Sequence, residues 1–130
     1  KGMKWRRLLN EEEISTDLVS LGFRTVYLED MTASQQITLF QTAEWIVAPN
    51  GSALLNLIFA DTNIRLLVLS QGNLFNWGNF QGPMNTLGYS PVFLCGDEAD
   101  AVDQKHADYV IPLTSVRRAL ADMGLVEAAA

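Results

Sequence analysis

The segment Ile64-Arg65-Leu66-Leu67-Val68-Leu69-Ser70 decides the fold class of this chain. It is the most apolar stretch of the sequence, and its apolar residues follow one another without the alternation of a strand that has one face in water. A continuous apolar strand of this length is buried on both faces, as in a parallel sheet that carries helices on both sides. We therefore expect this segment to be a central strand of a parallel sheet.

Predicted strands and helices alternate on both sides of this segment. Strands are predicted at residues 23–28, 44–48 and 91–95, with a short extended segment at 108–111, and helices at residues 11–21, 33–43, 54–58 and 115–123. Alternation in units of about 20 to 30 residues favours right-handed βαβ crossovers. The 130 residues are expected to form one three-layer, Rossmann-like α/β domain with a mainly parallel sheet of about four or five strands.

Polar residues at the predicted helix starts indicate where these helices begin. Asn10 precedes three glutamates and is expected to cap the first helix. Thr32 and Gln35 have the spacing of a capping box, and Thr114 or Ser115 is expected to cap the last helix. Two glycines are expected to end the first and the last of these helices, Gly22 and Gly124.

Charge and composition exclude several classes of function. The formal net charge of −6 opposes nucleic-acid binding, which needs an excess of Lys and Arg. Apolar runs are too short for a membrane span. The single cysteine, Cys95, excludes an intrachain disulfide, fits the reducing cytoplasm, and is expected to be a small buried residue of the predicted strand at 91–95.

Three further features each have a structural and a functional interpretation. The acidic run at residues 97–103 and the lone His106 are expected to be solvated surface, so that no metal site is predicted. Residues 71–90 form a long glycine-rich loop, in which Trp77 could stack on a base or a sugar, cover the sheet edge or contact another domain.

The loop after the predicted strand at 44–48 is the first candidate binding site. Ligands of such sheets bind beyond the carboxyl ends of the strands, and the segment PNGSA at residues 49–53 offers free backbone amides at a helix start. These amides can hold a phosphate, or the segment can be a simple tight turn in which Ser52 caps the helix. Common NTPase and dinucleotide fingerprints are absent from the sequence.

The wider pattern resembles glycosyltransferase family 61. Four segments carry this resemblance: RRLLNEEE at residues 6–13, LGF at 21–23, QQITLFQTA at 35–43, and IVAPNGSALLNLIF at 46–59. Members show an Arg-rich strand ending in Asn-Glu, a helix, a Gly-Phe strand, a Glu-Gln helix and a His-Gly-Ala-Gly-Leu-Thr-Asn loop. The likeness covers residues 5–69 well and the rest of the chain loosely.

The resemblance implies a function and its partners. It implies the donor-binding, C-terminal half of a GT-B enzyme of the capsular polysaccharide biosynthesis type, which moves a sugar from a nucleotide-sugar to a glycan or other hydroxyl acceptor. No cofactor is implied. The acceptor and the catalytic base would come from a preceding domain, so the chain alone is expected to be inactive, and any membrane association would belong to other parts of the parent. The alternative is a noncatalytic module that has lost donor binding.

The resemblance also implies which residues hold the donor phosphates. Arg6 and Arg7 would lie at a strand end, where a guanidinium can pair with a diphosphate. The alternative is that they are a solvated basic segment. The other implied donor-binding residues are Asn50, Gly51, Ser52, Ala53 and Asn56. Four positions of this loop depart from the family pattern, because Asn50 stands where His is usual, Ser52 replaces Ala, Ala53 replaces Gly and Leu55 replaces Thr.

Overall fold

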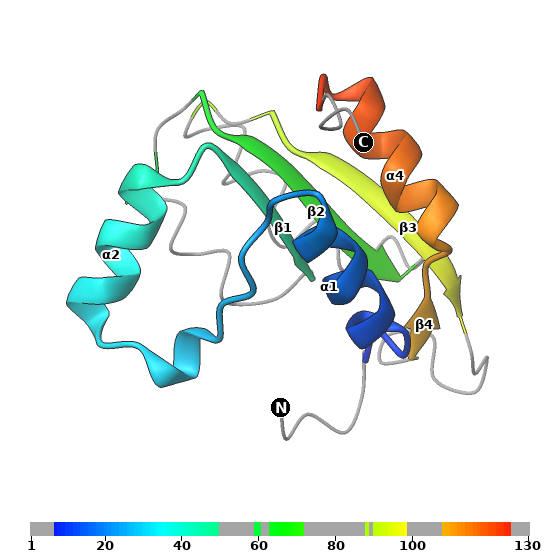
Figure 1. The fold of residues 1–130 in the computed structure, drawn as a ribbon, viewed down its shortest axis with the longest axis horizontal. Helices are drawn as coiled ribbons and strands as arrows, with labels where there is room; N and C mark the ends of the chain where they lie inside the picture. The colour runs from blue at the N-terminus through cyan, green and yellow to red at the C-terminus, as the bar shows by residue number, and fades with distance from the viewer. Residues whose placement is uncertain are drawn as a thin grey trace.

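The computed structural model of the 130-residue chain describes residues 7–49, 59–60, 63–71, 88, 90–98 and 108–125 (Figure 1). The elements within these ranges are α1 (Glu11–Ser20), the 3₁₀ helix η1 (Leu28–Asp30), α2 (Ala33–Thr42), β1 (Trp45–Pro49), β2 (Arg65–Gln71), β3 (Val92–Glu98), β4 (Tyr109–Val110) and α4 (Leu113–Asp122).

The described strands form one sheet in the order β1-β2-β3-β4. β1 pairs in parallel with β2, and β2 pairs in parallel with β3, whereas the short β4 runs antiparallel to β3. The predicted mixed α/β fold with parallel strands is confirmed. The strand count of the whole domain and its likeness to half of a GT-B enzyme stay predictions.

β2 is buried on both faces, as the sequence predicts. Leu67 and Leu69 are at most 2% exposed and pack into the cluster that includes α1 and α4, whereas Leu66 and Val68 are at most 1% exposed and pack into the cluster that includes α2. Two apolar faces on one strand require helices on both sides of the sheet. This strand is therefore the centre of the core.

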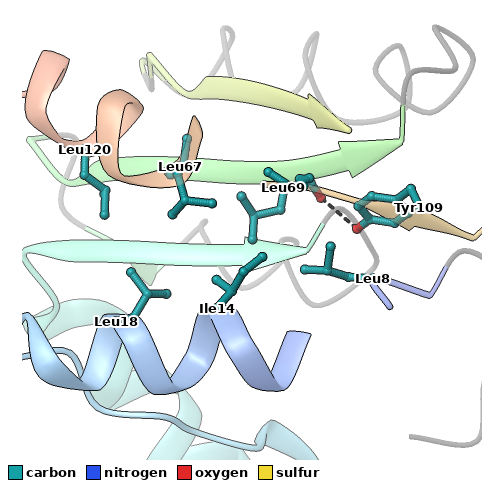
Figure 2. Packing of buried hydrophobic residues seen from close by; sticks show 9 residues of the cluster. Leu8, Ile14, Leu18, Leu67, Leu69, Tyr109 and Leu120 are labelled. Carbon is teal, nitrogen blue, oxygen red and sulfur yellow. Dashed lines mark hydrogen bonds between the residues drawn. The ribbon is translucent and has the colours of Figure 1, made fainter. Parts of the chain in front are cut away.

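The face shared by α1 and α4 carries the larger cluster. Ile14 and Leu18 of α1, one helical turn apart, point toward the leucines of β2 (Figure 2), and Leu120 of α4 joins the same cluster. On the opposite face Phe40 of α2 is 4% exposed and packs with Ile64 and the inward residues of β2.

Three of the predicted helix boundaries are confirmed, and the predicted cap of α4 is wrong. Gly124 follows the end of α4 with a φ of 99°, and its N–H donates to the Ala121 carbonyl. Gly22 ends α1 with a φ of 100°, and its N–H donates to the Val19 carbonyl. Thr32 and Gln35 form the reciprocal capping box that starts α2. Neither Thr114 nor Ser115 caps α4, because the carbonyl of Pro112 already accepts the Ser115 N–H and α4 begins at Leu113.

The predicted strand at residues 23–28 is wrong. The N–H of Phe23 donates back to Leu18, and residues 28–30 form η1. Tyr27 has extended backbone angles, with φ −110° and ψ 110°, yet its side chain is 59% exposed. Aromatic and β-branched residues here favour an extended backbone, but a strand also needs a hydrogen-bonded neighbour, and residues 23–27 belong to no described sheet.

β3 differs from its prediction at its carboxyl end. It continues beyond Cys95 to Glu98, so that the first residues of the acidic run at 97–103 belong to the sheet. Cys95 is exposed rather than buried. It shares a face with Phe93, and α2, the described helix on that face, packs mainly against β1 and β2.

Candidate functional site

The carboxyl ends of β1, β2 and β3 lie at one edge of the sheet, because the three strands are parallel (Figure 1). This carboxyl edge is where α/β sheets of this kind bind ligands. Most of the predicted donor-binding residues lie outside the described residues: Arg6, Asn50, Gly51, Ser52, Ala53 and Asn56. Trp77 and His106 lie outside them as well, which leaves Arg7 as the predicted site residue that the structure places.

Backbone pairing places Arg7 at the carboxyl edge. The Tyr109 N–H donates to the Arg7 carbonyl at 2.9 Å, and the Leu9 N–H donates to the Tyr109 carbonyl at 2.9 Å. Tyr109 in turn pairs with Glu98, the last residue of β3. The start of the described chain therefore extends the sheet by one parallel bridge between Leu8 and Tyr109 of β4, the strand that pairs with the end of β3.

The guanidinium of Arg7 is held by Asp108. Nε of Arg7 donates to Oδ2 of Asp108 at 3.3 Å, and Nη2 donates to the same oxygen at 2.9 Å. The backbone N–H of Arg7 donates to the other carboxylate oxygen, Oδ1, at 2.9 Å. The Arg7 side chain is 59% exposed and that of Asp108 is 20% exposed. One carboxylate thus fixes both the backbone and the side chain of Arg7.

This contact favours the charged form of both groups. Hydrogen bonds from the side chain and the backbone of Arg7 lower the pKa of Asp108 below its ordinary value. The hydrogen bond to Asp108, and then its charge, raise the pKa of Arg7. The arrangement presents a permanent cation at the carboxyl edge, with its own counter-ion beside it.

Asn10 has a different role from the predicted helix cap. It occupies the N-cap position of α1, but its side chain makes no capping hydrogen bond. Instead Nδ2 donates to the Ile111 carbonyl at 2.7 Å, and Oδ1 accepts the Ile111 N–H at 3.2 Å. The side-chain amide of Asn10 therefore pairs with the Ile111 backbone in the way a neighbouring strand would. These two hydrogen bonds connect the start of α1 to the segment just after β4 at the carboxyl edge.

Tyr109 anchors this edge to the core. Its side chain is 2% exposed, and its hydroxyl donates to the Leu69 carbonyl of β2 at 3.1 Å (Figure 2). Sequence reasoning placed the segment around Tyr109 in an extended conformation but did not connect it with Arg7 or Asn10. Local sequence patterns give no signal for such contacts, because Arg7 and Asp108 are 101 positions apart.

A second ion pair joins the same two regions away from the edge. Asp17 of α1 accepts from Nε and Nη2 of Arg117 in α4, each at 2.7 Å. This contact, mainly through its hydrogen bond, lowers the pKa of Asp17. The pair has the same chemistry as that of Arg7 and Asp108, so it offers an internal comparison for experiments on the edge.

The described residues contain neither a cluster of metal ligands nor a helix that could cross a membrane. No group of three or more His, Cys, Asp or Glu residues in those ranges could hold a metal ion. No helix within the same ranges combines the length and apolar content that crossing a membrane requires.

Comparison with known proteins adds one finding. The family model described as Glycosyltransferase 61 matches residues 1–67, more than half of the 130-residue chain. No curated protein and no solved structure matches significantly. The matched part includes Arg7, Asn10, α1, α2 and β1, and it ends within β2. The chain therefore belongs to glycosyltransferase family 61.

Proposed function

We propose that this domain is the donor-binding half of a glycosyltransferase, corresponding to the C-terminal half of a GT-B enzyme. It would hold a nucleotide-sugar whose sugar passes to a glycan or other hydroxyl acceptor in polysaccharide biosynthesis, of which capsular polysaccharide is the type we favour. Membership of the family supports sugar transfer in general. The observation that supports binding of the nucleotide-sugar donor is the position of Arg7 at the carboxyl edge of three parallel strands.

The proposed mechanism is electrostatic. As the bond between the sugar and the diphosphate breaks, negative charge grows on the departing diphosphate. Arg6 or Arg7 would stabilise that charge, together with backbone amides around Gly51 and Ser52. A base outside this chain would remove the proton of the acceptor hydroxyl. Asn50, Ala53 and Asn56 of the same loop would also bind the donor.

The parent enzyme would supply what this half lacks. A preceding domain would bring the acceptor and the base across a cleft, and we expect the chain alone to bind donor without transferring sugar. We place the reaction in the cytoplasm, where nucleotide-sugars are the activated donors.

A noncatalytic interaction module is the second candidate. The specific observation in its favour is that Nε and Nη2 of Arg7 already donate hydrogen bonds to Asp108, which is consistent with a purely structural ion pair. The two candidates differ in one measurable property, because the donor-binding domain must bind a nucleotide and the module need not.

Calorimetric titration with UDP, GDP and CMP tests the proposal. We expect saturable binding of a nucleoside diphosphate, weakened about tenfold or more by Arg7→Ala, since a hydrogen bond to a charged group is lost. Arg6→Ala/Arg7→Ala and Gly51→Val should weaken it further. Arg118→Ala, which removes an exposed charge from α4, is the control and should bind like wild type. Absence of binding to all three nucleotides by the folded protein would favour the noncatalytic module.

A further inference from the structure

We propose that Asp108 is a positioning residue for donor binding, which holds the Arg7 guanidinium at the carboxyl edge in the orientation that receives a nucleoside diphosphate. This inference rests on the proposed donor-binding function and adds a residue that lies outside the segment matched by the family model.

The geometry of the pair leaves part of the guanidinium for a ligand. An arginine side chain has five N–H donors in one plane. Asp108 accepts from Nε and from one side of Nη2, the side edge of the group. Both N–H groups of Nη1 and the second N–H of Nη2 are not used by Asp108. These form the end-on fork that pairs with two oxygens of a phosphate.

Burial assigns the two partners different roles. Asp108 is 20% exposed and adjoins Tyr109, which is 2% exposed and paired with Glu98 at the end of β3. The carboxylate is therefore carried by the residue next to a buried and paired position of the sheet. Arg7 is 59% exposed and would otherwise sample many rotamers. Holding it in one orientation before the ligand arrives reduces the entropy that binding must remove.

The negative charge of Asp108 also acts against diphosphate binding. The direction in which the affinity changes on mutation of Asp108 therefore tests the inference. A carboxylate beside a diphosphate repels it, so removing only this charge would strengthen binding. Removing the contacts that orient Arg7 would weaken binding. The proposal commits to the second effect being the larger.

Titration of the protein with UDP and with UMP at fixed ionic strength separates these effects. Asp108→Asn keeps the shape of the side chain but loses the charge-assisted contacts, and we expect UDP binding about threefold to tenfold weaker. The preference for UDP over UMP should fall with it, as for Arg7→Ala, because both changes act on the same phosphate contact. Asp108→Glu, which retains a carboxylate, should recover part of the loss.

Asp17→Asn is the matched control. It breaks the ion pair with Arg117, which has the same chemistry and also joins the two ends of the described chain, and it removes the same charge. We expect its UDP affinity and its preference for UDP over UMP to stay within about twofold of wild type. Thermal unfolding of each variant shows whether the fold is retained.

Each outcome supports or overturns the inference. Unchanged or tighter UDP binding by Asp108→Asn overturns it, and an equal loss in Asp17→Asn overturns it by showing a general effect on the fold. If Arg7→Ala binds UDP like wild type, Asp108 has no donor-binding residue to position, although a donor site at the Gly51 loop survives. If folded wild type binds none of UDP, GDP and CMP, the proposed function fails and this inference fails with it.

Discussion

At the scale of single residues, Gly96 is a position where the sheet has no room for a side chain. A Cβ atom there would lie 2.6 Å from Cγ1 of Ile111 and 2.9 Å from the carbonyl carbon of Val110, and it would also meet the Val110 carbonyl oxygen. The obstacle includes backbone, which cannot rotate away as a flexible side chain would. Gly96 thus allows the chain to pass close to β3 on its way from β4 to α4.

We expect Gly96→Ala to destabilise the fold by about 3 kcal/mol or more, measured by urea unfolding, because overpacking against backbone forces the sheet apart. Gly22→Ala is the comparison. Nothing lies within 4 Å of a Cβ at Gly22, so only its φ of 100° opposes the change, at a cost of about 1 to 2 kcal/mol. Equal losses in the two variants would contradict the close approach at Gly96.

Asn10 is the residue whose role changes most between sequence and structure. Asn10→Ala removes two hydrogen bonds to the Ile111 backbone, and we expect unfolding to become easier by about 1 to 3 kcal/mol. Asn10→Asp keeps an acceptor for the Ile111 N–H but places a carboxylate oxygen against the Ile111 carbonyl. An ordinary helix cap tolerates aspartate well, so retention of wild-type stability by Asn10→Asp would contradict the pairing with Ile111.

At the scale of elements, α2 owes its start to a local motif. Thr32 accepts the Gln35 N–H at 3.1 Å, and the Gln35 side chain accepts the Thr32 N–H at 2.9 Å. We expect Thr32→Ala to lower the free energy of unfolding by about 1 kcal/mol. Ser34→Ala, an exposed change in the same turn, should cause no loss because alanine favours the helix. Chemical denaturation of both variants checks this, and similar losses in the two would exclude the capping box as the cause.

At the scale of the whole molecule, ion pairs join the two ends of the described chain. Asp17 and Asp108 both have a lowered pKa in the folded protein, so their contribution to stability is present above the ordinary aspartate pKa of about 3.9 and is lost as the pH falls through the lower folded values. Asp17→Asn/Asp108→Asn should therefore be less stable than wild type at neutral pH.

The difference in urea midpoint between that double variant and wild type should shrink as the pH is lowered from about 5 toward 2. Both pairs are partly exposed, so we expect a modest difference that also decreases at high salt. A midpoint difference that stays constant across this pH range would show that the two carboxylates do not act through their charge.

Sequence by itself determined the features that depend on neighbouring residues. The run of apolar residues at 66–69 identified the buried strand β2, because a strand covered on both faces does not alternate apolar with polar positions. Thr32 with Gln35 fixed the start of α2, and Gly22 fixed the end of α1, because caps need only residues a few positions apart. Family motifs in the first half of the chain identified glycosyltransferase family 61.

Tertiary structure alone decided the features that need a distant partner. The predicted strand at 23–28 is extended at Tyr27 yet is no strand, because no neighbouring chain in the described sheet pairs with it. Arg7 acquired its counter-ion, and Asn10 its backbone partner, from residues 101 positions away. Such contacts depend on how the sheet brings the chain ends together, and no local pattern of the sequence encodes that distance.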